Sequence, residues 1–460
     1  MRWFLIRHRR IRRSPEEPVA CAPMSPGEEA GSTLWPLSQI SVKGLFGNRD
    51  FALVLDSDAT VLTGENGSGK STLLRAIRLL STEQWTDFAT LPLDRLELAF
   101  HDGGELAAEI QDGCLILSSG AEKWTFDLET ASQVDPRLLL ELQHARRDPA
   151  GQFRRQRLHR WPREPYLRHG GTAVEEIEAL VPPEWLADMT DRFQTRLISA
   201  RRLEHRLRPD PGSQGEETPT PVVEQYAEEL RARMRDELSV YAAESRSQER
   251  NLPAQIVHAM QGASETSEGA EELADEVEQL RDSVRSLAAS LASVGLFQEE
   301  DPDHFAGYPR DNKLILLAVR EVYRVTKARL ERLTAFRSDL ELFNSFLNQR
   351  FSNKRIVLSQ DRGIGVELPD RGFIAPSQLS SGEQQLLALA YVLLFKTDPT
   401  SVVLLDEPEL SLHVAWLKGL LAAFLDIGQA RRLQFVIATH SPSVLAGHTE
   451  LERSLDLASE

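Results

Sequence analysis

The sequence predicts an α/β fold, in which a mixed sheet with helices and an antiparallel side sheet are interrupted by a long, all-α, partly coiled-coil insertion. Three observations support this prediction. Toward both ends of the chain, short apolar runs alternate with helical stretches, which is typical of a buried parallel sheet. A glycine-rich turn directly follows one of these runs and opens a helix. The middle of the chain is charged instead, and its apolar residues recur with the spacing of long helices.

The composition limits the classes of function. The 53 basic and 70 acidic side chains among 460 residues give a net charge of −17, so any site for a polyanion has to be local. Two cysteines, Cys21 and Cys114, cannot build a disulfide framework or a thiolate metal site, which favours a cytoplasmic protein. The longest apolar run, 386–395, is about half of the roughly 20 residues that cross a bilayer, so we expect no membrane helix.

We expect four parts along the chain: a basic N-terminal arm (1–36), an N-terminal lobe of the α/β core (37–128), a helical insertion (129–349) and a C-terminal lobe of the core (350–460). The N-terminal arm carries six arginines in its first 13 residues. It is either a disordered arm or the result of a start codon that truly lies at Met24.

The expected strands of the two lobes are short β-branched and apolar runs bounded by turn residues. In the N-terminal lobe, the opening strands of the core should be 40–42, 51–55 and 60–63, and the antiparallel side sheet should be 96–100, 105–110 and 114–118. In the C-terminal lobe we expect a hairpin at 355–359 and 364–368, a helix from Gly382, and buried strands at 402–405 and 434–438.

Two heptad seams mark the helical insertion. Apolar residues recur at alternating spacings of four and three from Leu273 to Val294, and a second seam runs from Leu316 to Leu347. A joint rich in proline, 301–309, lies between them, so we expect the seams to pair as an antiparallel helical arm. The alternative is that both helices pack on the core. The segment 208–221 is rich in Pro, Gly, Ser and acids and predicts a flexible loop.

A phosphate-binding loop is predicted at 64–72. Its sequence, Gly-Glu-Asn-Gly-Ser-Gly-Lys-Ser-Thr, lies between a predicted strand and a predicted helix, which is the context that such a loop requires. The backbone N–H groups would surround phosphate oxygens at the positive end of the helix. Lys70 would hold the β- and γ-phosphates of ATP, and Ser71 would bind Mg²⁺. The residues assigned to nucleotide binding here are Gly64, Asn66, Gly67, Ser68, Gly69, Lys70, Ser71 and Thr72.

Two adjacent acids follow the apolar strand that begins at Val402. Asp406 is positioned to hold Mg²⁺ through water, and Glu407 is positioned to activate the attacking water. Without a phosphate loop in the chain, the two acids could merely cap the following helix.

Two further polar features complete the predicted site. The turn 379–385, Leu-Ser-Ser-Gly-Glu-Gln-Gln, opens a helix and offers a second anion-binding helix start, although the same residues also make an ordinary helix cap. His440 follows the strand 434–438, where a contact with a γ-phosphate could lie. A single histidine at a strand end is more often structural.

In this order the four motifs resemble the ATPase head of the ABC class, which transporters share with SMC proteins, RecF and the OLD-family ATPases. The resemblance covers 37–125 and 350–445. It implies a composite site, in which two heads enclose two ATP molecules and each ATP touches the phosphate loop of one head and the signature turn of the other.

The resemblance also implies roles for single residues. Ser380 and Gly382 would touch the γ-phosphate in the partner head, Glu407 would be the general base, and His440 would be the switch histidine. Ser381 stands where many relatives have glycine, which is a mild departure from the family pattern.

The segment 407–413, Glu-Pro-Glu-Leu-Ser-Leu-His, resembles the non-transporter branch, and the insertion lacks the CxxC of a zinc hook. Only 20 residues follow His440, too few for the nuclease domain of the OLD enzymes, so we expect nuclease chemistry to come from another chain. Short motifs such as 197–203 look like those of the ATPase subunit of PARIS-type anti-phage systems and, more distantly, of Septu-type ATPases. Arg201 replaces a glutamine of many relatives, which implies slow hydrolysis.

One basic segment, 144–169, holds eight arginines and three histidines among three aromatic residues. Arginine for phosphate and aromatics for stacking is the composition of a nucleic-acid groove. The same composition suits docking of an acidic protein partner. It also suits a solvated face that neutralises the acids of this chain.

We therefore expect a cytoplasmic ATPase that uses ATP and Mg²⁺ and forms an ATP-sandwiched homodimer or a higher oligomer. By closing its heads, it would regulate an effector, a nuclease encoded nearby, in bacterial anti-phage defence. Two alternatives stay open: a RecF-like ATPase that binds DNA in repair, and an assembly scaffold with slow turnover.

Overall fold

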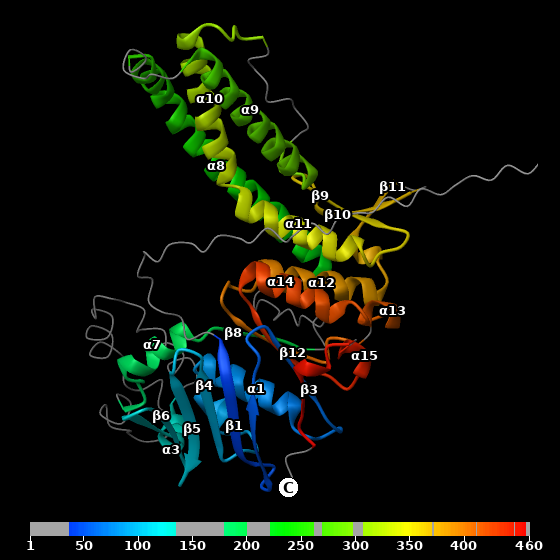
Figure 1. The fold of residues 1–460 in the computed structure, drawn as a ribbon. Coiled ribbons are helices and arrows are strands. Elements are labelled where there is room, and N and C mark those ends of the chain that lie inside the picture. The colour runs from blue at the N-terminus through cyan, green and yellow to red at the C-terminus, as the bar shows by residue number, and fades with distance from the viewer. Residues whose placement is uncertain are drawn as a thin grey trace, which may run out of the picture. The chain divides into compact units, whose positions relative to one another are not determined.

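The computed structural model describes residues 36–134, 179–199, 221–261, 269–297, 307–369, 372–410, 412–445 and 447–456 (Figure 1). The basic segment 144–169, Arg201, and all but the last residue of the N-terminal arm lie outside these residues. No helix in the described ranges combines the length and the hydropathy that a membrane span requires.

A five-stranded parallel sheet forms the centre of the α/β core. Its strand order is β14-β3-β13-β12-β8, and every neighbouring pair is parallel. The bounds are β3 (Ala59–Thr63), β8 (Thr195–Ile198), β12 (Val402–Asp406), β13 (Gln434–Ala438) and β14 (Glu452–Ser454). The strands β3, β12 and β13 are almost fully buried, because helices or a second sheet cover both faces of a parallel sheet.

The two faces of this sheet belong to two separate hydrophobic cores. Val403 and Leu405 of β12 point into one core, together with α12 (Ser381–Phe395) and α14 (Leu420–Arg431). The alternate residues Val402 and Leu404 point into the other core, together with α1 (Lys70–Ser81). This alternation follows from the two-residue period of a strand, and it puts α1 and α12 in different cores.

A six-stranded antiparallel sheet, β2-β1-β4-β5-β6-β7, covers the α1 side. The predicted side sheet is confirmed by β4 (Arg95–Phe100), β5 (Glu105–Gln111) and β6 (Cys114–Ser119), and β7 (Glu122–Asp127) extends it. One expectation was wrong: the runs 40–42 and 51–55 do not open the parallel core. They form β1 (Leu37–Leu45) and β2 (Arg49–Val54) of the antiparallel sheet. Fewer than half of the residues of each strand are buried, which suits a sheet with one covered face.

Smaller elements complete the core. The predicted C-terminal hairpin is confirmed by β9 (Arg355–Ser359) and β10 (Gly363–Leu368), to which β11 (Gly372–Ile374) adds a third strand. The short helices are α2 (Trp85–Phe88), α3 (Leu128–Gln133), α7 (Glu184–Arg192), η3 (Pro376–Gln378), α13 (Val414–Leu417), α15 (Pro442–Leu445) and η4 (Thr449–Leu451). The overall fold class, a mixed α/β core with an antiparallel side sheet and a helical insertion, is confirmed.

The insertion is not entirely helical, which differs from our expectation. Its residues Thr195–Ile198 form β8, which pairs with β12 at the edge of the parallel sheet. A strand of four residues is too short to show a clear period in the sequence. Its pairing with β12, and not its local sequence pattern, therefore defines this strand.

Four long helices lie in the described part of the insertion: α8 (Val222–Gln261), α9 (Ala270–Ser293), α10 (Lys313–Glu331) and α11 (Thr334–Asn348) (Figure 1). The two seams do lie on α9 and on α10 with α11, but the expected antiparallel pairing of these seams was wrong. Arg310 before α10 and Arg320 within it form ion pairs with Asp275 and Glu276 at the start of α9. The first turns of α9 and α10 therefore lie together, and the two helices run parallel.

The antiparallel partner of both helices is α8. Arg329 near the end of α10 donates to Ser245 in the middle of α8 at 2.9 Å, while Met260 at the end of α8 lines one hollow with Leu314 at the start of α10. Tyr241 of α8 packs on Phe297, just after α9, with ring centroids 5.5 Å apart. A heptad seam predicts the buried face of a helix but not its partner, which explains the wrong pairing.

Candidate functional site

The predicted phosphate loop lies between β3 and α1. Its three glycines, Gly64, Gly67 and Gly69, have φ angles of +145°, +83° and +103°, a region that side chains other than glycine rarely adopt. Gly69 is also required by space, because a Cβ atom there would lie 2.4 Å from Cδ2 of Leu45. Within the loop, Ser68 is buried, and Asn66 and Gly67 are exposed, so a ligand can reach them.

Lys70 lies inside the loop. Its Nζ donates to the carbonyl oxygens of Gly64 (2.8 Å) and Glu65 (3.0 Å) and to Oγ of Ser68 (3.1 Å). Burial lowers the pKa of Lys70, and nearby carboxylates, led by Asp456, offset part of this effect. The ammonium group is thus held in a place where a bound anion would stabilise its charge.

Asp406 and Ser71 meet at the ends of β12 and of the phosphate loop. Ser71 Oγ donates to Oδ1 of Asp406 at 2.7 Å, and Thr72 follows in the first turn of α1. A hydroxyl and a carboxylate are oxygen ligands that suit Mg²⁺, which usually completes its shell with water and phosphate oxygens. These two residues therefore fit the ion, and among the described residues no cluster of three or more His, Cys, Asp or Glu side chains offers another metal site.

Glu407 and His440 lie at the same edge of the sheet. Nε2 of His440 is 3.8 Å from Oε1 of Glu407, and Nδ1 of His440 is 3.5 Å from Nζ of Lys70. Glu407 has a φ angle of +48°, a left-handed conformation that costs free energy in a non-glycine residue and concentrates at functional sites. Its N–H donates to the carbonyl oxygen of Ala438 at 2.9 Å, so β13 holds this strained residue in place.

Glu409 is a positioning residue that the sequence analysis missed. Its Oε1 accepts hydrogen bonds from Oγ1 of Thr439 and from the backbone N–H of His440, the latter at 3.1 Å. Glu409 belongs to the Glu-Pro-Glu motif, which in the sequence distinguishes only the branch of the class. Its position two residues after Glu407 was the available signal.

The turn that carries Ser380 is built differently. Ser380 caps α12, and its backbone N–H and its Oγ both donate to Oε2 of Glu383, at 2.8 Å and 2.7 Å. Lys354 Nζ donates to the same carboxylate at 2.6 Å. Burial raises the pKa of Glu383, but the hydrogen bonds from Lys354 and Ser380 outweigh burial and hold it below its ordinary value. In the described part of the chain, the hydrogen bonds of Ser380 stay within its own turn and do not reach the phosphate loop.

A protein-family model described as "AAA domain, putative AbiEii toxin, Type IV TA system" matches residues 59–168 and 208–446. The chain belongs to this AAA family. The matched ranges contain the phosphate loop, Asp406, Glu407 and His440, so ATP is the nucleotide that family membership supports.

Solved structures similar to this AAA chain include the SMC head domain from Thermotoga maritima (13% identity, TM-score 0.38, 91% of this chain and 94% of that chain covered). They also include the Smc head domain with an extended coiled coil bound to the C-terminal domain of ScpA, derived from Pyrococcus furiosus (16%, 0.36, 89% and 91%). At these TM-scores the likeness is weak, and the family assignment does not depend on it. No curated protein matches the chain.

Two further residues, which precede the part of the chain that the family model matches, border the phosphate loop. Phe46 is an exposed aromatic, 47% accessible, and its ring lies 3.4 Å from the place that a Cβ atom of Gly69 would take. Arg49 donates from Nη1 to the carbonyl oxygen of Ser68 at 3.2 Å. Neither residue has a local sequence signal, because both reach the loop through the pairing of β1 and β2. An exposed ring beside a phosphate loop can stack on a nucleotide base.

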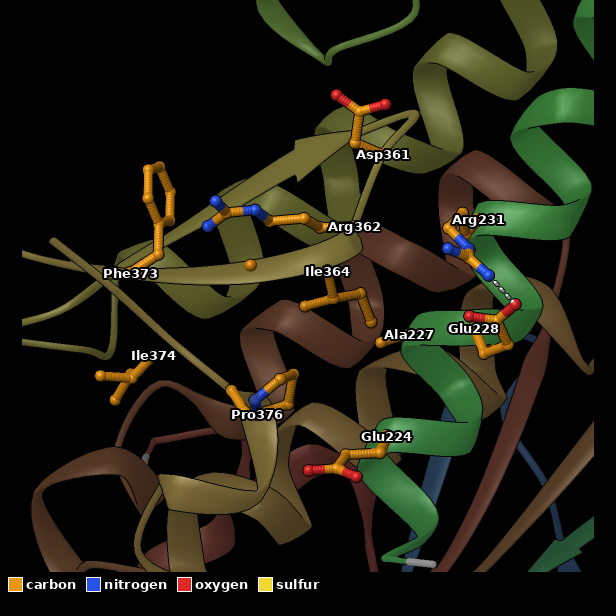
Figure 2. Close-up of a pocket in the computed structure, with 12 residues that line it drawn as sticks. Glu224, Ala227, Glu228, Arg231, Asp361, Arg362, Ile364, Phe373, Ile374 and Pro376 are labelled. Atoms are coloured by element: carbon orange, nitrogen blue, oxygen red, sulfur yellow. Dashed lines mark hydrogen bonds and ion pairs between the residues drawn. The ribbon is translucent and has the colours of Figure 1, made fainter.

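A hollow of about 360 Å³ borders the Ser380 side of the AAA domain (Figure 2). Arg362 lies over the ring of Phe373, 4.3 Å from its centroid, and Pro376 forms the opposite wall. Pro376 belongs to η3, which leads into the Ser380 turn, and Ser377 of η3 donates to Glu224 of α8. The first turn of α8 is therefore joined to η3, the segment that leads into the Ser380 turn.

Proposed function

We propose that this chain is an ABC-type ATPase that hydrolyses ATP, slowly, between two associated heads. The observation that supports this most directly is one cluster at the carboxyl edge of the parallel sheet. It contains a phosphate loop, a hydroxyl–carboxylate pair for Mg²⁺ and a carboxylate beside a histidine, supplied by Lys70, Ser71, Asp406, Glu407 and His440. Parallel strands bring their carboxyl ends to one edge, where ligands of α/β proteins bind.

The roles follow from the chemistry of these groups. Backbone N–H groups of the loop and the ammonium of Lys70 bind the phosphates, and Ser71 and Asp406 would hold Mg²⁺, which would offset phosphate charge. Glu407 accepts a proton from the attacking water as the general base. His440, oriented by Glu409 through its backbone N–H, contacts the γ-phosphate and senses its presence.

Dimerisation completes the proposed site. Ser380 and Gly382 lie at the start of α12, which packs in a different hydrophobic core from α1. The signature turn that contacts each ATP would therefore come from a second copy of the chain. Leu410 and Val414, which follow Glu407 closely, are 47% and 67% exposed. Apolar side chains exposed beside a catalytic edge suit a contact with another copy.

The biological role that we propose is control of an effector. Closing of the heads would act through the Ser380 turn on α8 and the helical bundle, and would release or activate an effector, a nuclease supplied by another chain in the cytoplasm. The family description, which names a toxin of a toxin–antitoxin system, and the resemblance to PARIS-type subunits support a role in anti-phage defence. Repair of DNA through 144–169 and an assembly scaffold are the alternatives.

The test is complementation between two inactive variants. Lys70→Ala should abolish ATP binding, and Ser380→Arg should leave ATP binding intact but block hydrolysis by blocking the partner's γ-phosphate. A mixture of the two variants forms some dimers in which one site has an intact loop and an intact signature turn. Recovery of up to about a quarter of the wild-type ATPase rate, from random pairing, supports sharing of the site. No recovery, with both variants folded and paired, would contradict the sharing of each site between two chains.

A further inference from the structure

The strand β14 brings a distant part of the chain to the phosphate loop. Ser454 is the register partner of Thr63, the last residue of β3, and the N–H of Leu455 donates to the carbonyl oxygen of Thr63 at 3.0 Å. Because the two strands are parallel, both carboxyl ends point the same way. The residue after Leu455 therefore lies beside the residue after Thr63, where the phosphate loop begins.

That residue is Asp456, and its carboxylate contacts the loop. Both of its oxygens accept from the backbone N–H of Glu65, at 2.8 Å and 3.1 Å. A Cβ atom on Gly64 would lie 3.0 Å and 3.1 Å from the same two oxygens, so the carboxylate and the first glycine of the loop fit closely. The N–H of Asp456 donates to Oγ of Ser454 at 3.2 Å, which orients the residue locally.

We propose that Asp456 is a positioning residue of the nucleotide site, which fixes the first peptide of the phosphate loop and places a negative charge beside Lys70. These two effects oppose each other. The hydrogen bond to Glu65 holds the loop in its binding shape, whereas the charge partly neutralises Lys70 and repels a triphosphate. The charge of Asp456 is the largest of those that raise the pKa of Lys70, which agrees with this placement.

Asparagine separates the two effects. In Asp456→Asn the amide oxygen can still accept from the N–H of Glu65, but the charge is gone. In Asp456→Ala both are lost. A matched control is Glu452→Gln in the same strand: Glu452 accepts from Oγ1 of Thr63 at 2.7 Å, a bond that glutamine can keep, and this bond joins it to β3 rather than to the phosphate loop.

The experiment measures Kd for ATP and for ADP with the full chain of each variant, by calorimetry without hydrolysis, together with Tm. We expect Asp456→Asn to tighten ATP binding about three- to tenfold, as removal of one nearby repulsive charge should, and to tighten ADP binding less. Asp456→Ala should bind ATP at least about threefold more weakly than Asp456→Asn, and Glu452→Gln should match the wild type.

The inference rests on the proposed ATP binding, and the two can fail separately. If the wild-type chain binds no ATP, the proposed function is wrong. If the wild type binds ATP but Asp456→Asn binds it no more tightly, or gains equally for ATP and ADP, the charge effect is wrong. If Asp456→Ala binds as well as Asp456→Asn at equal Tm, the positioning effect is wrong.

Discussion

The phosphate loop and the Ser380 turn are both glycine-bearing turns that open a helix, yet the chain builds them in different ways. At the phosphate loop, polar groups arrive from β3, β12, β13 and β14, which are far apart in sequence and adjacent in one sheet. At the Ser380 turn, the serine donates to Glu383 of its own helix. The first site is assembled by tertiary structure, and the second by a local cap.

This difference shows what each half of the proposed composite site requires. Lys70 has three oxygen acceptors within 3.1 Å in its own loop, so its position is set before a ligand arrives. Ser380 satisfies its hydroxyl within its own turn, and its side chain can turn to a phosphate only by giving up that hydrogen bond. The free energy of a second head and its nucleotide would have to offset this loss.

The largest expected effect is on the phosphate loop itself. Gly69→Ala should weaken ATP binding by at least about 100-fold, because a Cβ atom would clash with Leu45 at 2.4 Å in addition to the strain of φ +103°. Gly67→Ala is the matched control, since its φ is also positive but no atom lies within 4 Å of the added carbon. Kd values for ATP check both variants. Equal losses would mean that backbone strain, and not the contact with Leu45, defines this loop.

The Ser380 turn depends on a part-buried ion pair instead. Lys354→Met should lower the free energy of unfolding by about 1–3 kcal/mol, because it leaves Glu383 without its charged partner and both side chains are largely buried, 25% and 13% exposed. Lys396→Met breaks an ion pair with Glu229 that is 36% and 44% exposed, and should cost less than about 1 kcal/mol. Urea unfolding measures both values.

A second measurement on Lys354→Met tests whether the Ser380 turn and the phosphate loop act independently. Lys354→Met should leave the ATP affinity of the phosphate loop unchanged while reducing ATP-driven dimerisation, followed by light scattering. A loss of ATP affinity as large as the loss of dimerisation would show that the two turns are coupled within one chain.

The sequence predicted the phosphate side more completely than the Ser380 side. The spacing of 64–72 and the acids after Val402 place Lys70 and Asp406 at one edge, because parallel topology alone brings strand ends together. The sequence could not predict the roles of Asp456 and Lys354. Asp456 contacts Glu65, 391 positions away, and Lys354 contacts Glu383, 29 positions away. Contacts of that kind depend on which elements become neighbours in the fold, and no local pattern encodes that.

The same reason explains the errors in the fold. β1 and β2 have the composition of core strands, but most of their residues are not buried, and both strands lie in the antiparallel sheet. The seams on α9 and α10 predict buried faces correctly, while the partner, α8, has a weaker apolar stripe along its 40 residues and was not recognised. Elements are encoded locally, and their neighbours are not.

A moderate effect is expected at the rim of the phosphate loop. Phe46→Ala should weaken ATP binding about tenfold, because it removes the exposed ring on which a base can stack. Phe373→Ala, an aromatic of similar exposure, 48%, on the Ser380 side, should leave ATP affinity unchanged. Fluorescence titration with a labelled nucleotide compares the two. An unaffected Phe46→Ala would place the base elsewhere.

The smallest expected effects concern pH. At the phosphate loop, ATP affinity should fall as pH rises, whereas at the Ser380 turn, stability should fall as pH falls. Burial lowers the pKa of Lys70, so its charge is lost earlier than usual as pH rises, and ATP affinity should fall on the alkaline side. The pKa of Glu383 is also lowered, against the effect of burial, by hydrogen bonds from Lys354 and Ser380. A carboxylate with a lowered folded pKa stabilises the fold above its unfolded pKa, and that contribution disappears as pH falls through the folded value.

Variants can therefore assign the acid loss of stability to Glu383 and the alkaline loss of ATP affinity to Lys70. In the wild type, Tm should fall on the acid side, below the ordinary pKa range of a glutamate, and Glu383→Gln should remove part of that fall because it has no proton to gain. The alkaline loss of ATP affinity should persist in Glu383→Gln. Saturating ATP should shift this loss to higher pH, because the negative charges of the bound phosphates raise the pKa of Lys70. If Glu383→Gln changed the alkaline limb instead, the phosphate loop and the Ser380 turn would share one titration, and the contrast between a tertiary site and a local cap would be wrong.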